Sequence, residues 1–379
     1  MSVREPTADD GAPALPPVTV ERVRSQPLSV PLIEPFVIAS GRIDVTRAVL
    51  VEAAVAGDGG RRGIGYGEAA ALPPVTREDQ PELLAAIAAA APALEGARLE
   101  RWGDVADAVA RVLPGSAVAR AGVEVALLDA WARAAGVPLA HALGLPASSP
   151  LAALETDMTL PISAPDHMAG LARRHRAAGF NCFKVKVGRD WRADLASLRA
   201  VAAAVPDARF RLDANAGFHA ADALALLDGA LGDGLTVECF EQPCATGDLQ
   251  GMAQLCAASP VPIVADESFR GAEDLDRLLA ARAAHAINLK LVKLGGPLAA
   301  VALGRRARAA GLRLMAGAMV ETRVGLLAMA HVVAALGGVD WVDLDTAFLL
   351  ASDPFAGGWR VTGARIELTG EPGLGVNRL

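Results

Sequence analysis

The chain has little cysteine, few aromatic residues and none of the common short metal or nucleophile motifs. Its 379 residues include four cysteines that form no Cys-x-x-Cys pair, and six histidines without metal-ligand spacing. A zinc site is therefore not indicated, and reduced, mostly buried thiols are the expected state. The absence of Gly-x-Ser-x-Gly removes one common nucleophilic-serine motif. Aromatic residues are 4% against 53% hydrophobic residues, which favours a large core of aliphatic side chains.

Excess positive charge and long apolar runs are also lacking. Lys plus Arg number 36 against 43 Asp plus Glu, so neither nucleic acid nor an anionic membrane is an expected partner. The longest apolar run, residues 83–94, is too short to span a membrane and contains Pro92. The acidic, proline-rich N-terminus lacks the features of a secretory signal. We expect a soluble cytoplasmic protein whose residues 1–16 form a disordered leader.

Beyond that leader the sequence divides into three parts. Residues 17–148 read as strands followed by a block of helices, which predicts an α+β domain. Residues 149–350 alternate short apolar strands with Ala- and Leu-rich helices, the pattern of an α/β fold with a (β/α)8 TIM-type barrel. Residues 351–379 form a C-terminal segment. The eight predicted barrel strands are marked at intervals of 24 to 29 residues by Thr159, Lys186, Asp213, Glu241, Asp266, Lys290, Met319 and Asp343.

The stretch FKVKVG, residues 183–188, alternates apolar residues with lysines, which is typical of a β-strand. Lys184 and Lys186 therefore share one face of that strand. In a TIM barrel the active site lies at the C-terminal ends of the strands. A surface charge would explain any one charged strand end, but the repeated position favours one shared site. Five consecutive predicted strands end in a lysine, three carboxylates and a lysine: Lys186, Asp213, Glu241, Asp266 and Lys290.

Three neighbouring carboxylates raise one another's pKa unless a cation binds. Oxygen ligands without His or Cys favour a hard ion, so Asp213, Glu241 and Asp266 are the predicted ligands of one Mg2+ per subunit. A lysine with an ordinary pKa near ~10.4 is a poor base at neutral pH, and a nearby cation with partial burial would lower it toward ~7–8. A metal with a lysine on either side suits proton removal from the carbon next to a carboxylate, with return from the opposite face.

These residues, in this order, resemble the enolase superfamily, in particular its muconate-lactonizing-enzyme-like subgroup with the motif Lys184-Val185-Lys186. The resemblance covers nearly the whole chain and implies that residues 17–148 are a capping domain to which the C-terminal segment returns. It implies catalytic roles for Lys186 and Lys290, with Lys184 orienting the substrate carboxylate. The last predicted strand, WVDLDTAFLL, carries Asp343 and Asp345, and this pair looks like the motif by which dipeptide epimerases hold the substrate's α-ammonium group.

Further site residues follow from the same resemblance or from strand parity. Thr159 and Met319 are expected to contact substrate, and Glu321 to lie near them. Asn215, two residues beyond Asp213, and Glu267, beside Asp266, are expected to support the metal ligands. Lys293 has the opposite parity from Lys290 and is interpreted as structural or solvent-facing. The glycine-rich GIGYGEA at 63–69 does not match Gly-x-Gly-x-x-Gly and is interpreted as a strand or turn of the capping domain.

One departure concerns the cap loop PFVIASGRID. Epimerases acting on L-Ala-D/L-Glu resemble one another in a PF…R loop that grips an acidic side chain. Here the matching position is Gly41, and Arg42 follows one place later. We therefore expect a substrate side chain other than glutamate and keep Arg42 as a candidate substrate-binding residue.

The resulting hypothesis is a Mg2+-dependent dipeptide epimerase, an isomerase of amino acid derivatives. Two alternatives lie in the same subgroup, a cycloisomerase acting on a muconate-like diacid and an N-acylamino-acid racemase. A more distant alternative is a metal-dependent binding protein without turnover. The sequence leaves homo-oligomerisation open, since only analogy with other barrels bears on it.

Overall fold

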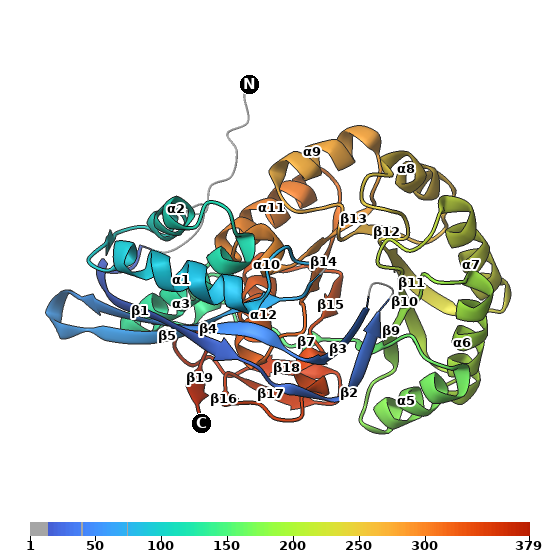
Figure 1. Cartoon of the computed structure of the whole chain (residues 1–379), viewed down its shortest axis with the longest axis horizontal. Helices are drawn as coiled ribbons and strands as arrows, with labels where there is room; N and C mark the ends of the chain where they lie inside the picture. Colours follow the sequence, from blue (N-terminus) through green and yellow to red (C-terminus); the bar gives the residue numbers. More distant parts are fainter. Residues whose placement is uncertain (1–13, 39–40, 74) are drawn as a thin grey trace.

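The 24-to-29-residue repeat folds into eight parallel strands of one sheet, in the order β15-β14-β13-β12-β11-β10-β9-β8. An isolated parallel bridge between Thr156 and Val342 joins the first and last edges, so the barrel is nearly closed and the expected fold class is confirmed (Figure 1). The strands are β8 (Met158–Leu160), β9 (Cys182–Lys186), β10 (Arg209–Asp213), β11 (Thr236–Glu241), β12 (Ile263–Ala265), β13 (Ala286–Leu289), β14 (Arg313–Gly317) and β15 (Trp341–Asp343).

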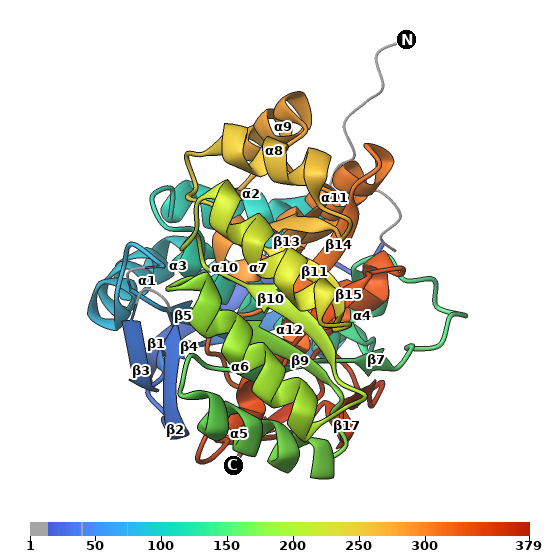
Figure 2. The ribbon, with the colours of Figure 1, turned by 90° about the vertical axis from the view of Figure 1, so that its right-hand side faces the viewer.

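Helices cover the outer face of the barrel, and Figure 2 shows α5 to α9 stacked along it. The last unit differs from the expected strand–helix pattern, because β15 is followed by the 3-10 helix η2 (Thr346–Leu349). The short helix α10 (Leu291–Leu294) directly follows β13. The longer helices are α5 (Pro165–Ala177), α6 (Trp191–Ala204), α7 (Ala220–Gly232), α8 (Leu249–Ala258), α9 (Ala272–Ala281), α11 (Pro297–Ala309) and α12 (Arg323–Leu336).

The N-terminal domain is an antiparallel sheet of order β5-β4-β1-β6 packed against helices. It lies to one side of the barrel mouth (Figure 1). Its elements are β1 (Val18–Leu28), β2 (Pro31–Ile38), β3 (Gly41–Val45), β4 (Arg47–Gly57), η1 (Asp58–Gly60), β5 (Arg62–Ala71), β6 (Arg98–Leu99), α1 (Gln80–Leu94), α2 (Trp102–Val112), α3 (Ala117–Ala135) and α4 (Leu139–Ala142).

The GIGYGEA stretch is part of strand β5, as expected, and its glycines allow β5 to lie directly on α3. A Cβ on Gly63 would lie 1.9 Å from the carbonyl oxygen of Ala130, and one on Gly67 would lie 2.0 Å from that of Gly122. Any side chain at these positions would therefore push the helix away from the strand. This close packing places Glu68, the next residue of β5, at the boundary with the barrel.

The hairpin β2–β3 and the C-terminal segment both join the two domains. The Ile162 N–H donates to the carbonyl oxygen of Val37 at 3.0 Å, which ties the hairpin to the loop after β8. The Leu374 N–H donates to Asp129 of α3 at 2.7 Å, so the C-terminal segment contacts the N-terminal domain. Its strands are β16 (Phe355–Gly357), β17 (Trp359–Thr362), β18 (Arg365–Leu368) and β19 (Val376–Arg378), and β18 also pairs with β7 (Leu154–Glu155).

The structure describes residues 14–38, 41–73 and 75–379, and most of the expected leader, residues 1–13, lies outside them. Within its described part, the carbonyl oxygen of Pro16 accepts a hydrogen bond from Trp131 Nε1 at 2.9 Å. That contact places Pro16 on the folded domain rather than in a leader. Over the described ranges, no helix has both the length and the apolar composition needed to cross a membrane.

A buried glutamate of α3 makes folding stability depend on pH. Glu124 accepts a hydrogen bond from the Leu298 N–H at the start of α11, at 2.9 Å, and burial raises its pKa from 4.5 to about 8. The folded state therefore favours the protonated form. The stabilisation is fully present below about pH 4.5 and is lost as the pH rises through about 8.

We expect Glu124→Gln to remove this dependence, because glutamine accepts the same hydrogen bond and does not ionise. Relative to the variant, the unmodified protein should lose about 1.4 kcal/mol of unfolding free energy per pH unit between those two values. Urea unfolding at several pH values measures this difference. Glu371→Gln, at an exposed position, serves as the control, and parallel curves for Glu124→Gln and the unmodified protein would contradict the prediction.

Candidate active site

The lysine face of β9 points into the barrel. Lys184 is 1% exposed, and its Nζ lies 2.6 Å from Glu241 Oε2, 2.7 Å from Asp343 Oδ2 and 3.1 Å from Asp213 Oδ2. Burial alone would favour the neutral amine, but these carboxylates outweigh it and raise the pKa of Lys184 well above its usual range. Lys184 is therefore a fixed cation between three acids.

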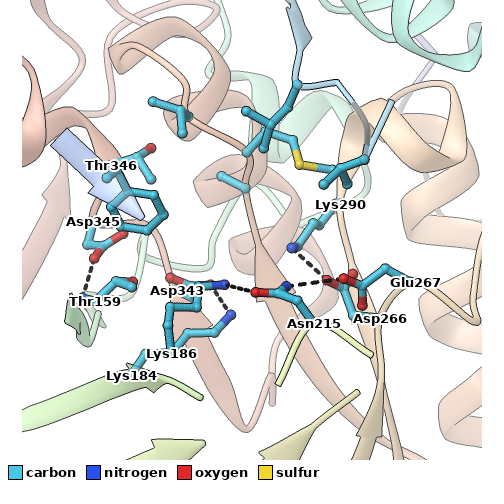
Figure 3. Close-up of a pocket in the computed structure, with 16 residues that line it drawn as sticks. Thr159, Lys184, Lys186, Asn215, Asp266, Glu267, Lys290, Asp343, Asp345 and Thr346 are labelled. Atoms are coloured by element: carbon cyan, nitrogen blue, oxygen red, sulfur yellow. Dashed lines mark hydrogen bonds and ion pairs between the residues drawn. The ribbon is translucent and has the colours of Figure 1, made fainter. Parts of the chain in front are cut away.

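Lys186, the next lysine on that face, lies closer to the mouth. Its Nζ is 2.6 Å from Asp213 Oδ2 and 3.1 Å from Asn215 Oδ1. Asn215 Nδ2 in turn donates to Glu267 Oε1 at 3.1 Å, so the two predicted supporting residues form one chain behind Lys186 (Figure 3). Asn215 also adopts a left-handed backbone conformation, with φ of 43°, which asparagine tolerates better than most residues.

Lys290 stands across the pocket from Lys186, directly after β13. Its Nζ lies 2.8 Å from Asp266 Oδ2 (Figure 3). The solvent-facing interpretation of Lys293 is wrong, because the short helix α10 turns its buried side chain back to the same carboxylate. Lys293 Nζ donates to Asp266 Oδ1 and, at 2.6 Å, to the Asp266 carbonyl oxygen. Strand parity could not predict this contact, since the residue is no longer in the strand.

The three predicted metal ligands are all buried, but their pKa values shift in different directions. Burial opposes ionisation of Asp213 and Asp266, yet the adjacent lysines outweigh it and lower both pKa values. Burial and the neighbouring Asp213 raise the pKa of Glu241 to about 7. Glu241 Oε1 accepts from Asn288 Nδ2 at 2.6 Å, whereas Oε2 has an ion pair with Lys184 but no hydrogen bond. This oxygen is therefore already held by the Lys184 cation.

A second acidic group lies next to the first, because Lys184 pairs with Asp343 as well as with Asp213 and Glu241. Among residues 14–38, 41–73 and 75–379, the acids whose ligand atoms lie within 4.8 Å of one another are Asp157, Asp343 and Asp345. Asp345 Oδ2 accepts a hydrogen bond from the Thr159 N–H at 2.5 Å, and its Oδ1 is buried without a partner. Burial and the adjacent Asp343 raise the pKa of Asp345 to about 6. A cationic group placed there would be stabilised by the ionised carboxylates of Asp343 and Asp345.

Asp157 was not predicted, and its other contacts show what it does. Its Oδ2 is 2.8 Å from Arg211 Nη1, which also donates to the carbonyl oxygen of Val342. Burial, together with the nearby Asp343, raises its pKa well above the usual range. Asp157 thus joins β10 to β15 beneath the pocket.

The pocket beside these two groups is small, about 50 Å³. Its walls include Thr159, Lys186, Lys290 and Met319, together with Thr346 of η2. Figure 3 shows Thr159, Asp345 and Thr346 on one side and Lys290, Asp266 and Glu267 on the other. The structure thus brings together the two lysines, the expected substrate-contacting residues and Asp343 with Asp345.

Four predicted residues do not line this pocket, namely Asp213, Glu241, Arg42 and Glu321. Arg42 lines a separate hollow of about 230 Å³ and forms an ion pair with Asp44 at 2.9 Å, so it does not reach the lysines in this structure. Glu321 is buried behind the wall, where its Oε1 accepts from the Met319 N–H at 2.8 Å, and burial raises its pKa to about 7. Glu321 therefore fixes the turn that carries Met319.

Glu68 of β5 joins the capping sheet to the same turn. Its Oε2 accepts hydrogen bonds from the Thr322 hydroxyl at 2.6 Å and from the Gly325 N–H at 3.2 Å, at the start of α12. Burial and the charge of Glu321 raise its pKa to about 8. Sequence reasoning missed this contact because nothing in β5 indicates which helix it meets.

A compositional signal could have identified Lys293. The chain contains four lysines, Lys184, Lys186, Lys290 and Lys293, and the remaining 32 of its 36 basic residues are arginines. All four lysines lie in this site, three of them in the pocket wall. An amine that can lose its proton is the property that arginine lacks. The rarity of lysine elsewhere therefore points to Lys293 as a member of the site.

Fold and site together define a capped TIM-type barrel with paired lysines and carboxylates at its mouth. Residues 167–378 match the family described as enolase C-terminal domain-like, and residues 21–144 match the mandelate racemase / muconate lactonizing enzyme N-terminal domain. The chain belongs to this enolase superfamily, as its sequence motifs predicted.

Relatives over almost the full length carry the names of dipeptide epimerases, which are isomerases. The aromatic dipeptide epimerase of Herpetosiphon aurantiacus is 38% identical over 366 residues, 95% of this chain and 99% of its own. The L-Ala-D/L-Glu epimerase of Bacillus subtilis is 34% identical over 358 residues, 94% of this chain and 96% of its own. A substrate-liganded structure of the Bacillus subtilis enzyme superimposes with a TM-score of 0.88, covering 94% of this chain and 98% of that one.

Another similar structure, from Enterococcus faecalis, was solved as a dipeptide epimerase with Mg and the dipeptide L-Leu-L-Tyr. It is 29% identical, with a TM-score of 0.86, and the match covers 95% of this chain and all of that one. The expected likeness to the dipeptide epimerases is therefore confirmed.

Proposed function

We propose that this protein is a Mg2+-dependent dipeptide epimerase that inverts the carbon next to the C-terminal carboxylate. The observation that carries the proposal is the placement of Lys186 at the end of β9 and Lys290 directly after β13, with three strands between them, in the wall of one pocket. Amines on two sides of a bound carbon are what a two-base proton transfer requires.

Residues of this chain carry out both proton-transfer steps. One of the two lysines, in its neutral form, takes the proton from the carbon, and the electron pair moves into the carboxylate as an enolate. The other lysine, protonated, gives a proton to the opposite face, which inverts the centre. Lys184 stays charged and adds positive potential beside the substrate carboxylate. It lies two residues before Lys186 on the same face of β9, where its charge acts on Lys186 as a like charge.

Asp213, Glu241 and Asp266 are the residues that would hold a divalent ion, because they are buried oxygen donors at the ends of three adjacent strands. They are not among the acids whose ligand atoms already lie within 4.8 Å of one another, so binding an ion would require their side chains to move closer together. When bound, the ion supplies positive charge to the substrate carboxylate. In the structure as it stands, burial opposes the charge of Lys290, but Asp266 outweighs it and raises the pKa. A cation that offset the negative charge of Asp266 would lower the pKa of Lys290 toward the range of an effective base.

The pair Asp343 and Asp345 supports a dipeptide over a simple acid. A buried cation needs carboxylate partners, and Asp345 has an oxygen that no group of the described chain satisfies. An α-ammonium group beside this pair would place the peptide bond toward the lysines. A muconate-like diacid or an N-acylated amino acid lacks that cation, so both rivals leave Asp345 Oδ1 without a partner.

The test is a dipeptide library incubated with enzyme and Mg2+ in deuterated water. We expect deuterium to enter the α-carbon of the second residue and the second diastereomer to appear in the proton NMR spectrum. N-acylated amino acids and muconate lactones, assayed in parallel, test the two rivals. Exchange with those compounds, and none across the library, would contradict the proposal.

The proposal also includes one Mg2+ per subunit, a cytoplasmic location and a homo-oligomer as one possible assembly. The domain boundaries at residues 148 and 350 also remain predictions from the sequence.

A further inference from the structure

A second hollow adjoins the pocket and has a different chemical character. Its volume is about 290 Å³, against about 50 Å³ for the pocket itself, and the two share Phe36 and Thr159 as walls. The hollow lies between β2, α5 and η2, and β2 lies beside α5 in both Figures 1 and 2. Most of its lining is apolar: Ile33, Pro35, Phe36, Leu171, Phe348 and Leu349.

The sizes decide where a substrate side chain can lie. The pocket beside the lysines offers much less free space than the hollow, so we place the reacting carbon and its carboxylate in the pocket. We expect the rest of a bound dipeptide to extend into the larger hollow, which has room for an aromatic ring.

The hollow adjoins the acidic side of the pocket, not the side of Lys290. Thr159, which belongs to both spaces, donates its N–H to Asp345. Phe348 and Leu349 belong to η2, the short helix that begins directly after Asp345. Figure 3 likewise shows Thr159 beside Asp345 and across the pocket from Lys290. A side chain in the hollow is therefore attached to the carbon that carries the ammonium group, which is the first residue of a dipeptide.

Charges at the rim of the hollow cancel one another. Glu34 lies 2.9 Å from Arg174, so neither is left to attract a charged substrate group. Burial lowers the pKa of His175, which keeps its ring neutral at pH 7. Ile33 is 65% exposed, and it is one of four exposed large hydrophobic side chains within the described ranges. An apolar ligand group would remove this surface from water.

We propose that this hollow binds the side chain of the amino-terminal residue and that the protein prefers dipeptides whose first residue is large and apolar. The proposal rests on the epimerase function proposed above, and adds to it the class of side chain and the position at which that side chain is selected.

The experiment compares two dipeptides of the same composition, L-Phe-L-Ala and L-Ala-L-Phe, with L-Ala-L-Ala as the reference. Deuterium exchange at the second α-carbon yields kcat/KM for each. We expect L-Phe-L-Ala to exceed L-Ala-L-Ala by about tenfold or more, as a large apolar group in a fitting pocket should. L-Ala-L-Phe should show no comparable gain.

A substitution at the exposed edge of the hollow tests whether the side chain of the first residue binds there. Ile33→Lys adds a charge to the hollow at a position that tolerates a polar side chain, so folding is not at risk. We expect the ratio of kcat/KM for L-Phe-L-Ala over L-Ala-L-Ala to fall about tenfold. Ile64→Lys is the matched control, since Ile64 is 48% exposed on β5 and lines neither space, and it should leave the ratio unchanged.

The outcomes separate the two proposals. Exchange that favours L-Ala-L-Phe, or that is indifferent to the first residue, overturns the hollow's role and leaves the epimerase function standing. An unchanged ratio in Ile33→Lys overturns the location. No exchange with any dipeptide of the library overturns both.

Discussion

Replacing Lys290 by alanine should abolish epimerisation while one diastereomer of the substrate still exchanges its α-hydrogen. The reason is that each lysine serves one face of the carbon, so the remaining Lys186 can remove and return a proton only on its own side. We expect inversion to fall by about 10³-fold or more, the usual scale for a lost general acid or base. Lys186→Ala should show the same loss with the opposite diastereomer exchanging.

The control for charge is Lys290→Arg, which keeps a cation near Asp266 but cannot act as a base at neutral pH. It should lose inversion as fully as the alanine variant, and thermal melting of each variant checks that the fold is intact. Metal affinity should persist in the lysine variants, which distinguishes an enzyme from a binding protein without turnover. Inversion retained in Lys290→Ala would end the two-base mechanism.

Removing divalent ions should abolish activity, and Mg2+ should restore it. The structure contains two neighbouring acidic groups, so the matched variants Glu241→Gln and Asp157→Asn show which one holds the ion. Each replaces one buried carboxylate by its amide. We expect Glu241→Gln to weaken Mg2+ binding by about tenfold or more, on the scale reported for altered metal sites.

Asp157→Asn should leave Mg2+ affinity unchanged, because Asp157 pairs with Arg211 and lies with the acids assigned to the ammonium group. Titration calorimetry with Mg2+ measures both affinities independently of activity. Loss of Mg2+ binding in Asp157→Asn alone would move the metal to the other group and contradict the assignment of Asp213, Glu241 and Asp266.

Much of the barrel, including the charged residues at its strand ends, could be predicted from local sequence patterns. Strands of period two, separated by helices at intervals of 24 to 29 residues, predict a parallel barrel, and the residues at the ends of such strands must meet at one mouth. Lys186, Asp213, Glu241, Asp266 and Lys290 could therefore be predicted as neighbours without coordinates, because parity and strand position alone decide their direction.

Contacts that depend on the packing of distant segments could not be predicted in this way. Lys293 reaches Asp266 because it lies in the short helix α10, which follows β13 and turns the lysine side chain back toward Asp266. Glu68 reaches Thr322 across 254 positions, and Arg42 stays outside the pocket with Asp44. None of these follows from a local period, since each requires knowing which loop meets which.

By itself the sequence determined the superfamily, the barrel and the charged residues at its strand ends, because motifs, hydrophobic period and residue type act over a few neighbouring positions. Only the tertiary structure decided how the two acidic groups lie beside the pocket and where an apolar hollow adjoins it. The physical reason is that the hollow is formed by β2, α5 and η2, three segments far apart in the chain, and its shape exists only once they pack together.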